Sequence, residues 1–326
     1  MTTEPAGLSR RSVIRITGGA VLGAGAIGAV AWWATRSPAL ATLRGHVGPV
    51  RSIAVHSDGA LLASSGDDGT IRIWDTKSNR ELHRIEPGGR LRAVAFGPGT
   101  MLASSGDDAL VKLWDAASGE ATGALSGAKK ALECVAVSSD GERIVAAGIE
   151  GAVYFWQRRE NATPKAMPGH AKHVHAIAFT PDGKTVISGG EDGSLRFWDG
   201  TTGAALASHA PDKRHTFNLV TSSDGKMLLA SASGKGVKRW SLPDRKEMPP
   251  IDAAGMIRGV AISPDGRTLA TVHEDGAVKT WDAETAAPLE SHAGHQGAAL
   301  AVAFSADGTF FTAGGDGTVK RWRGRR

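Results

Sequence analysis

Residues 45–75 read GHVGPVRSIAVHSDGALLASSGDDGTIRIWD, and this stretch decides the fold. Three short runs of apolar and β-branched residues, 50–55, 61–65 and 71–74, are separated by turn sequences rich in glycine. Such runs predict β-strands, because glycine adopts the positive φ of a tight turn without steric cost. Residues 81–85 predict a fourth strand. The stretch therefore belongs to a unit of four short strands, each pair joined by a hairpin turn.

The same unit recurs along the chain of 326 residues with a period of 40 to 42 residues. Its clearest marker is a tryptophan at the end of the third strand, found at Trp74, Trp114, Trp156, Trp198, Trp240, Trp281 and Trp322. A turn containing Asp-Gly or Pro-Gly lies at the same place in each unit. Seven units of four strands predict an all-β protein, a seven-bladed β-propeller with four-stranded antiparallel blades.

Polar residues repeat together with the tryptophan, and in this the chain resembles the WD-repeat family between residues 39 and 326. In that family a histidine after glycine, a serine or threonine, an aspartate and the tryptophan form a hydrogen-bonded tetrad within each blade. The complete set occurs in three units, as His46, Ser64, Asp68 and Trp74, as His170, Ser188, Asp192 and Trp198, and as His295, Thr312, Asp316 and Trp322. A set that repeats around a ring indicates a structural network, so we predict no catalytic residue among them.

The other units depart from this pattern. The second unit has Gly89 instead of the histidine, and the sixth keeps only the threonine, aspartate and tryptophan. Glu150 in the third unit and Gly234 in the fifth stand at the position of the aspartate. We therefore expect the third and fifth blades to be held together less firmly.

The two ends of the repeat region predict how the ring closes. After Trp322 only four residues remain, so the seventh unit lacks its outer strand. Residues 39–43 lie where the outer strand of a preceding unit lies in every other repeat. This N-terminal strand is expected to complete the last blade and close a monomeric ring without an open edge between the first and last blades.

Residues 1–38 form a different kind of sequence. Arg10 and Arg11 precede residues 16–34, a run of nineteen residues without charge. The layout resembles a twin-arginine export signal of bacteria, and the run is also about long enough to span a bilayer. We expect either cleavage upstream of the closing strand, for example after Ala31, or retention as a membrane anchor, and the anchor is favoured because Trp32 and Trp33 suit an interface. Cleavage after Ala41 is disfavoured because it removes most of the closing strand.

Both alternatives predict a location outside the cytoplasm of a bacterium, in the periplasm or at the cell surface. The formal net charge of +5 comes without a long basic run, so no nucleic-acid partner is expected. The single cysteine, Cys134, excludes an intramolecular disulfide and a zinc site made of cysteines. His170, His173 and His175 share one loop and strand with no nearby carboxylate in the sequence, so we predict no metal and no cofactor.

The family resemblance implies that a partner binds on the face where the central channel opens. The exposed positions near the start of the innermost strands are Arg51, Arg92, Glu133, His175, Phe217, Arg258 and Leu300. Two residues earlier along the chain stand Pro49, Arg90, Ala131, His173, His215, Met256 and Ala298. Arginine and aromatic side chains often anchor interfaces, and cations predominate here. We predict a protein or peptide partner of acidic character, bound by Arg51, Arg90, Arg92, His173, His175, His215, Phe217 and Arg258.

The predicted function is that of a non-catalytic interaction scaffold. The alternative is an exported propeller enzyme of hydrolase, lyase or quinone-dependent dehydrogenase type. Such an enzyme needs carboxylates, histidines or metal ligands that converge on the channel, whereas the positions facing the channel here are mostly small and apolar.

Overall fold

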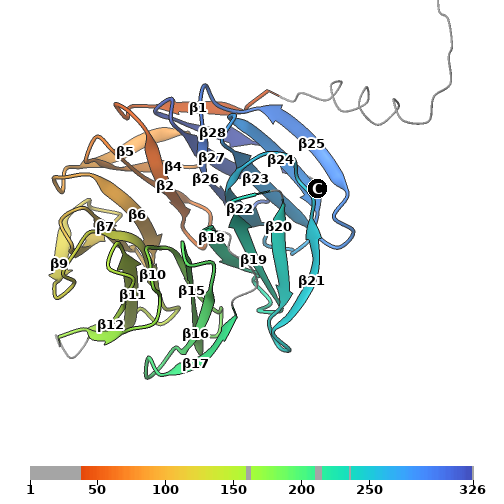
Figure 1. Ribbon diagram of the computed structural model, residues 1–326. Helices are drawn as coiled ribbons and strands as arrows, with labels where there is room; N and C mark the ends of the chain where they lie inside the picture. Colours follow the sequence, from red (N-terminus) through yellow and green to blue (C-terminus); the bar gives the residue numbers. More distant parts are fainter. Residues whose placement is uncertain (1–37, 159–162, 210–214, 235, 325–326) are drawn as a thin grey trace, which may run out of the picture. The chain divides into compact units, whose positions relative to one another are not determined.

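The computed structural model describes residues 38–158, 163–209, 215–234 and 236–324. These residues form seven four-stranded antiparallel sheets, arranged as the blades of a propeller (Figure 1). The prediction of an all-β, seven-bladed ring is therefore confirmed. The ring belongs to a compact unit that extends from Thr35 to Arg326. The predicted signal or anchor at residues 16–34 lies outside the described residues, so the division of the chain at residue 38 stays a prediction.

Six blades are each built from consecutive strands, which follow one another from the innermost to the outermost. Blade 1 contains β2 (Val50–Val55), β3 (Leu61–Gly66), β4 (Ile71–Asp75) and β5 (Arg80–Ile85). Blade 2 contains β6 (Leu91–Phe96), β7 (Met101–Gly106), β8 (Val111–Asp115) and β9 (Ala121–Leu125). Blade 3 contains β10 (Leu132–Val137), β11 (Arg143–Gly148), β12 (Val153–Gln157) and β13 (Lys165–Met167).

The remaining blades follow the same order. Blade 4 contains β14 (Val174–Phe179), β15 (Thr185–Gly190), β16 (Leu195–Asp199) and β17 (Ala205–His209). Blade 5 contains β18 (Thr216–Thr221), β19 (Met227–Ala232), β20 (Val237–Ser241) and β21 (Lys246–Ile251). Blade 6 contains β22 (Ile257–Ile262), β23 (Thr268–His273), β24 (Ala277–Asp282) and β25 (Pro288–Ala293). Blade 7 contains β26 (Ala299–Phe304), β27 (Phe310–Gly314), β28 (Thr318–Trp322) and, as its outer strand, β1 (Ala41–Arg44).

The hydrophobic core lies between neighbouring blades. The second strand of each blade is almost entirely buried, whereas the outer strand is mostly exposed, as β3 and β5 show. One cluster packs Leu62 and Trp74 of blade 1 against Phe311 and Val319 of blade 7. Each blade therefore buries its two faces only when both neighbours are present, so the repeats depend on one another for a complete core.

Strand β1 closes the ring. It pairs antiparallel with β28, with Ala41 opposite Arg321 and Arg44 opposite Thr318 (Figure 1). The backbone N–H of Leu40 also donates to the carbonyl of Arg321 at 2.8 Å. The expectation that the N-terminal strand completes the last blade is confirmed. The strand begins at Ala41 and not at residue 39, so a cut after Ala41 removes only one of its residues, and the reason for disfavouring cleavage there was wrong.

Three arginines fasten neighbouring blades to each other. The Arg321 guanidinium donates to the Thr76 carbonyl at 2.6 Å, across the seam where β1 closes the ring. Equivalent bonds of 2.8 Å join Arg143 to the Gly200 carbonyl and Arg239 to the Ala283 carbonyl. Each bond satisfies a carbonyl in the turn after the third strand of the next blade, so these seams carry polar contacts beside their apolar core.

Candidate functional site

The tetrads form a continuous chain of hydrogen bonds within a blade. In blade 4 the indole Nε1 of Trp198 donates to Ser188 Oγ at 2.9 Å, and this hydroxyl lies 2.8 Å from His170 Nε2. His170 Nδ1 lies 3.0 Å from the carboxylate of Asp192. A neutral imidazole with its proton on Nδ1 satisfies every group, because Ser188 then donates to Nε2. The same bonds connect His46, Ser64, Asp68 and Trp74 in blade 1 and His295, Thr312, Asp316 and Trp322 in blade 7.

Burial sets the charge state of these tetrads. It lowers the pKa of His46, His170 and His295, and it outweighs the neighbouring aspartate, which raises each pKa. Burial also raises the pKa of Asp192, but hydrogen bonds from His170 and Ser194 outweigh it and bring this pKa to about 2. The folded ring therefore favours a neutral imidazole beside an ionised carboxylate.

These shifts predict acid sensitivity in two stages. Since the folded pKa of each tetrad histidine lies below 6.5, the unfolded chain binds protons first as the pH falls. The stability that the histidines contribute is present above pH 6.5 and is lost below it, by up to about 1.4 kcal/mol for each pH unit by which one pKa is lowered. A second loss begins below pH 3.8, where unfolded aspartates protonate before Asp192 and Asp316 do.

Urea unfolding between pH 8 and pH 3 measures this dependence. A His170→Gln variant serves as the matched control, since its stability should fall less steeply below pH 6.5. A free energy of unfolding that stays constant or rises between pH 7 and pH 5 would contradict the neutral tetrads.

Two incomplete blades replace the tetrad with other bonds. In blade 2 the residue four positions before the inner strand, where blade 1 has His46, is Pro87 and not Gly89, so the sequence alignment of this loop was wrong. Trp114 Nε1 still donates to Ser104 Oγ at 2.9 Å. In blade 3 the indole of Trp156 donates instead to the backbone carbonyl of Ser126 at 2.9 Å. The buried tryptophans of both blades thus keep an acceptor without the histidine.

Blade 6 supplies its imidazole from a different place. His273, at the end of β23, is 1% exposed, and its Nε2 lies 2.9 Å from Thr271 Oγ1, which accepts the Trp281 indole proton. Blades 1, 4 and 7 have glycine at this position, and a Cβ at Gly314 would lie 2.5 Å from the ring of His295. The two histidine positions therefore exclude each other. Sequence reasoning missed His273, although the loss of the loop histidine together with a histidine in place of glycine was a usable signal.

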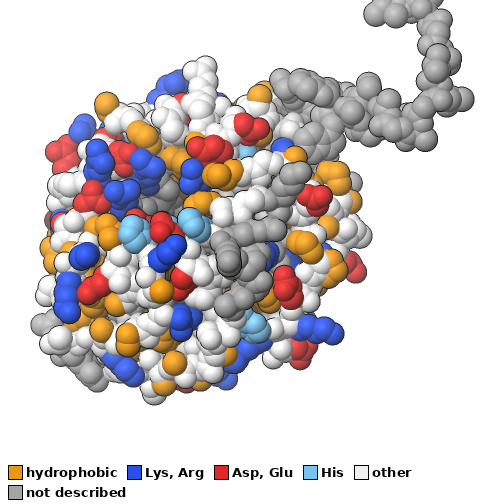
Figure 2. All heavy atoms as spheres, viewed as in Figure 1, with side chains coloured by type: hydrophobic (Ala, Val, Ile, Leu, Met, Phe, Trp, Pro, Cys, Tyr) orange, Lys and Arg blue, Asp and Glu red, His pale blue; other side chains and the backbone are white. Residues whose placement is uncertain are grey.

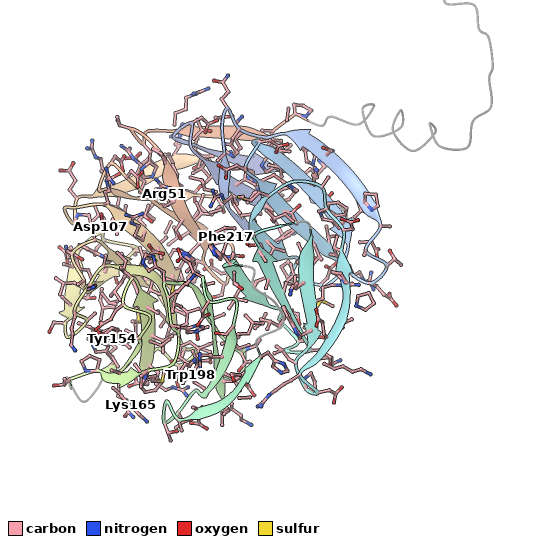
Figure 3. All side chains as sticks on the ribbon, in the orientation of Figure 1. Arg51, Asp107, Tyr154, Lys165, Trp198 and Phe217 are labelled. Carbon is pink, nitrogen blue, oxygen red and sulfur yellow. The ribbon has the colours of Figure 1, made fainter. Side chains whose placement is uncertain are left out.

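The seven predicted rim positions come together. They line one cavity of about 410 Å³ at the opening of the channel, one position from the inner strand of each blade. In Figure 3, Arg51 and Phe217 lie toward the middle of the ring, whereas Trp198 lies toward its periphery. We call these seven residues the rim, namely Arg51, Arg92, Glu133, His175, Phe217, Arg258 and Leu300. The positions two residues earlier, among them Arg90, His173 and His215, do not line this cavity.

Each rim arginine is paired with a carboxylate of its own blade. Arg51 makes two bonds to Asp67, of 2.9 and 2.6 Å, and Arg92 bonds Asp107 at 2.9 Å. Arg258 is similarly paired with Glu274. The hydrogen bond from Arg51 holds the pKa of Asp67 below its usual range. Figure 2 shows the result, with blue and red side chains beside each other on this face.

These pairs remove the basis for predicting an acidic partner, because that prediction counted only the cations of the rim. Each paired acid directly precedes the aspartate position of its blade, as in Asp67-Asp68 and Glu274-Asp275. The doubled acids were therefore a signal in the sequence. They were missed because pairing along a blade is visible only once the second and innermost strands lie side by side.

Histidines and carboxylates meet between blades 3 and 4. His175 Nδ1 contacts Glu133, and its Nε2 lies 3.2 Å from Glu191 Oε1. His173 Nδ1 lies 3.6 Å from the same oxygen of Glu191. The view that these histidines have no nearby carboxylate was wrong, since both acids are distant in sequence. Among the described residues, no group of three or more histidines, cysteines and acids is placed to hold a metal ion.

The rest of the rim is apolar. The guanidinium of Arg258 lies over Phe217 of blade 5, with its Cζ atom 4.9 Å from the centre of the Phe217 ring. Leu300 of blade 7 lines the same cavity. Blades 5 and 7 carry Ser233 and Gly315 where blades 1, 2 and 6 have the paired acid. The rim is therefore charged on blades 1 to 4 and on blade 6, whereas blades 5 and 7, on either side of blade 6, contribute the apolar Phe217 and Leu300.

Comparison with known proteins identifies the repeats. The family described as "WD domain, G-beta repeat" matches residues 37–75, 81–115, 119–157, 162–199, 252–282 and 286–323. Similar proteins include the small ribosomal subunit protein RACK1 of Medicago sativa, 42% identical over 57 residues, or 18% of each chain. The ribosome biogenesis protein erb1 of Aspergillus niger is 49% identical over 45 residues, which are 14% of this chain and 6% of that protein. The ribosome biogenesis protein BOP1 homolog of Caenorhabditis elegans is 44% identical over 57 residues, 17% of this chain and 8% of the relative.

The matching segments span less than a fifth of the length of these relatives. The relatives come from plants, a fungus and a nematode, and their names refer to the ribosomal subunit or to ribosome biogenesis. The predicted location outside the cytoplasm of a bacterium is therefore contradicted.

No helix within the described parts of the chain is long and apolar enough to cross a membrane. The six matched segments cover most of the ring, and the unmatched residues 200–251 include all four strands of blade 5, whose tetrad positions are the least regular. With these repeats and a seven-bladed ring, the chain belongs to the WD-repeat family of β-propellers.

Proposed function

We propose that the ring is a non-catalytic scaffold that binds a protein or peptide partner at the mouth of its channel. The observation that carries this proposal is the convergence of the seven rim residues on one cavity of about 410 Å³. A cavity of this size takes one or two side chains of a partner, while the surrounding loops offer a wider contact face. The WD-repeat relatives support interaction rather than catalysis, and the absence of enzymatic activity stays a prediction.

The chemistry of the rim favours a partner with both polar and apolar groups. The Arg51 side chain is 36% exposed, and Asp67 holds it in place. Such a guanidinium keeps further N–H groups for a partner and loses little entropy when it binds. Phe217 and Leu300 supply the apolar side chains of the rim, on which an aliphatic or aromatic side chain can rest. The proposed partner therefore carries an apolar anchor flanked by hydrogen-bond acceptors.

The names of the relatives fit this role. RACK1 is named as a protein of the small ribosomal subunit, and erb1 and BOP1 are named for ribosome biogenesis. A subunit protein and a biogenesis factor both work in contact with other macromolecules. This supports a scaffold, without identifying the partner of the present chain.

Substitution of the rim arginines tests the proposal. The triple variant with Arg51→Gln, Arg92→Gln and Arg258→Gln should retain less than about a tenth of the partner, because charged hydrogen bonds contribute about 1.5–3 kcal/mol each. Its free energy of unfolding should fall by no more than roughly 1 kcal/mol per pair, since these ion pairs are partly exposed. The measurement is quantitative capture of proteins from cell extract, together with urea unfolding.

The matched control removes the same charge elsewhere, through Arg80→Gln, Arg84→Gln and Lys226→Gln on exposed positions outside the mouth. It should capture as much partner as the unmodified ring. Equal capture by the rim variant and the control would show that the partner binds on another surface.

A further inference from the structure

One rim position differs chemically from the other charged ones. In blades 1, 2 and 6 the base at the rim is arginine, which keeps its charge at every physiological pH. In blade 4 the equivalent base is His175, whose charge changes near neutrality. Among the bases of the rim, the one that titrates near neutrality is therefore confined to blade 4.

The contacts of His175 require a protonated ring. Nδ1 contacts a Glu133 oxygen, and Nε2 lies 3.2 Å from Glu191 Oε1. A carboxylate oxygen only accepts, so both ring nitrogens must donate, and only imidazolium carries two N–H groups. Neutral His175 has one N–H and leaves the other carboxylate facing a lone pair. The observed arrangement thus belongs to the charged form.

This contact crosses a seam between blades. Glu133 lies on β10 of blade 3, whereas His175 and Glu191 belong to blade 4. The Glu133 and His175 side chains are only 19% and 20% exposed, and both line the mouth. Neutral His175 can donate to only one of the two carboxylates, so loss of the proton weakens the contact between the two blades and leaves one carboxylate at the channel opening without its imidazole N–H.

We propose that Glu133, His175 and Glu191 form a pH-sensitive latch at the mouth, closed at low pH, where His175 binds both carboxylates across blades 3 and 4, and open at high pH, where it binds only one. The opening adds one negative charge to the mouth and so changes the affinity for a partner there. This second consequence rests on the proposed function, whereas the latch itself does not.

The surroundings favour the closed state near neutrality. Burial lowers the pKa of His175, but the hydrogen bonds and charges of Glu133 and Glu191 outweigh it, and the pKa is raised above 6.5. Three further groups face the latch. His173 shares Glu191, Arg92 acts on Glu133 through space, and the Phe217 ring centre lies 6.1 Å from that of His175. Stability from the latch is present below pH 6.5 and is lost as the pH rises through the raised pKa, opposite in sign to the tetrads.

NMR titration of the complete ring tests the latch without any partner. The His175 ring signals should titrate above pH 6.5, and the Phe217 ring signals should follow with the same midpoint. In Glu133→Gln the midpoint should fall by about 1 pH unit or more, because an adjacent opposite charge is lost. Glu120→Gln removes the same charge from an exposed turn and should leave the midpoint unchanged.

The outcomes separate the two proposals. A His175 midpoint at or below 6.5, or one that Glu133→Gln leaves in place, overturns the latch whatever the rim binds. If the midpoint behaves as expected, capture of partner at pH 6 and pH 8.5 should differ for the unmodified ring and not for His175→Gln. Equal capture at both pH values would overturn the link between the latch and binding, while loss of capture in the arginine variant would still support the mouth as the binding face.

Discussion

Replacing Trp198 with alanine should lower the free energy of unfolding by about 3–5 kcal/mol, the range for removing a large buried aromatic side chain. Trp198 is 3% exposed and packs in the cluster that joins blades 3 and 4. Its indole also donates to Ser188, so the substitution breaks the tetrad that begins there. Urea unfolding of the purified ring measures the loss.

Trp240→Ala is the informative comparison, because this tryptophan is equally buried, at 2%. Blade 5 has Ala230 where blade 4 has Ser188, and Gly234 where it has the aspartate. Trp240→Ala therefore removes the same buried apolar surface as Trp198→Ala, but it breaks no complete tetrad. Its loss in the free energy of unfolding should be smaller by roughly 1 kcal/mol. Trp198→Phe keeps most of the volume and isolates the hydrogen bond. Equal losses for the two alanine variants would show that the tetrads add nothing measurable.

Leu43→Ala should destabilise the whole ring by about 2–5 kcal/mol, although the residue lies near the beginning of the ring. Leu43 is 4% exposed and belongs to the cluster shared by blades 1 and 7. Weakening β1 also exposes the edge of β28, which invites pairing with other chains. Thermal melting with size-exclusion chromatography detects both effects.

The adjacent residue provides the control. Thr42 lies on the same strand, but its side chain faces solvent. Thr42→Ala should change the melting temperature little and leave the ring monomeric. If both variants behave alike, closure by β1 does not limit stability.

Periodicity explains why the ring and its rim were predictable from sequence. Once seven tryptophans fix the repeat, equivalent positions follow by counting, and this located Arg51 and Phe217 at the channel mouth. Counting fails where a loop contains several turn-forming residues, and the glycines after Pro87 shifted the alignment of blade 2 by two positions. Counting also fails where one blade supplies the same chemical group from another sequence position, as blade 6 does with the imidazole of His273.

Interactions between units were harder to foresee. The Glu133–His175 contact joins two repeats, and the sequence of neither repeat alone predicts it. The location was misjudged for a related reason, because residues 16–34 were interpreted from local composition alone, whereas the relatives of the repeat region come from eukaryotes.

The pairing of β1 with β28 also determines when the ring can be finished during synthesis. Each of the first six blades consists of consecutive strands and can form its local hairpins soon after it emerges. Strand β1 emerges before all of them, yet its partner is the last strand of the ring. Bringing two such distant segments together costs about 5 kcal/mol of chain entropy, which only the joint burial of two seams offsets. A chain whose synthesis stops before β28 therefore keeps β1 unpaired and its core open. The closed ring can form only after the last blade has been synthesised.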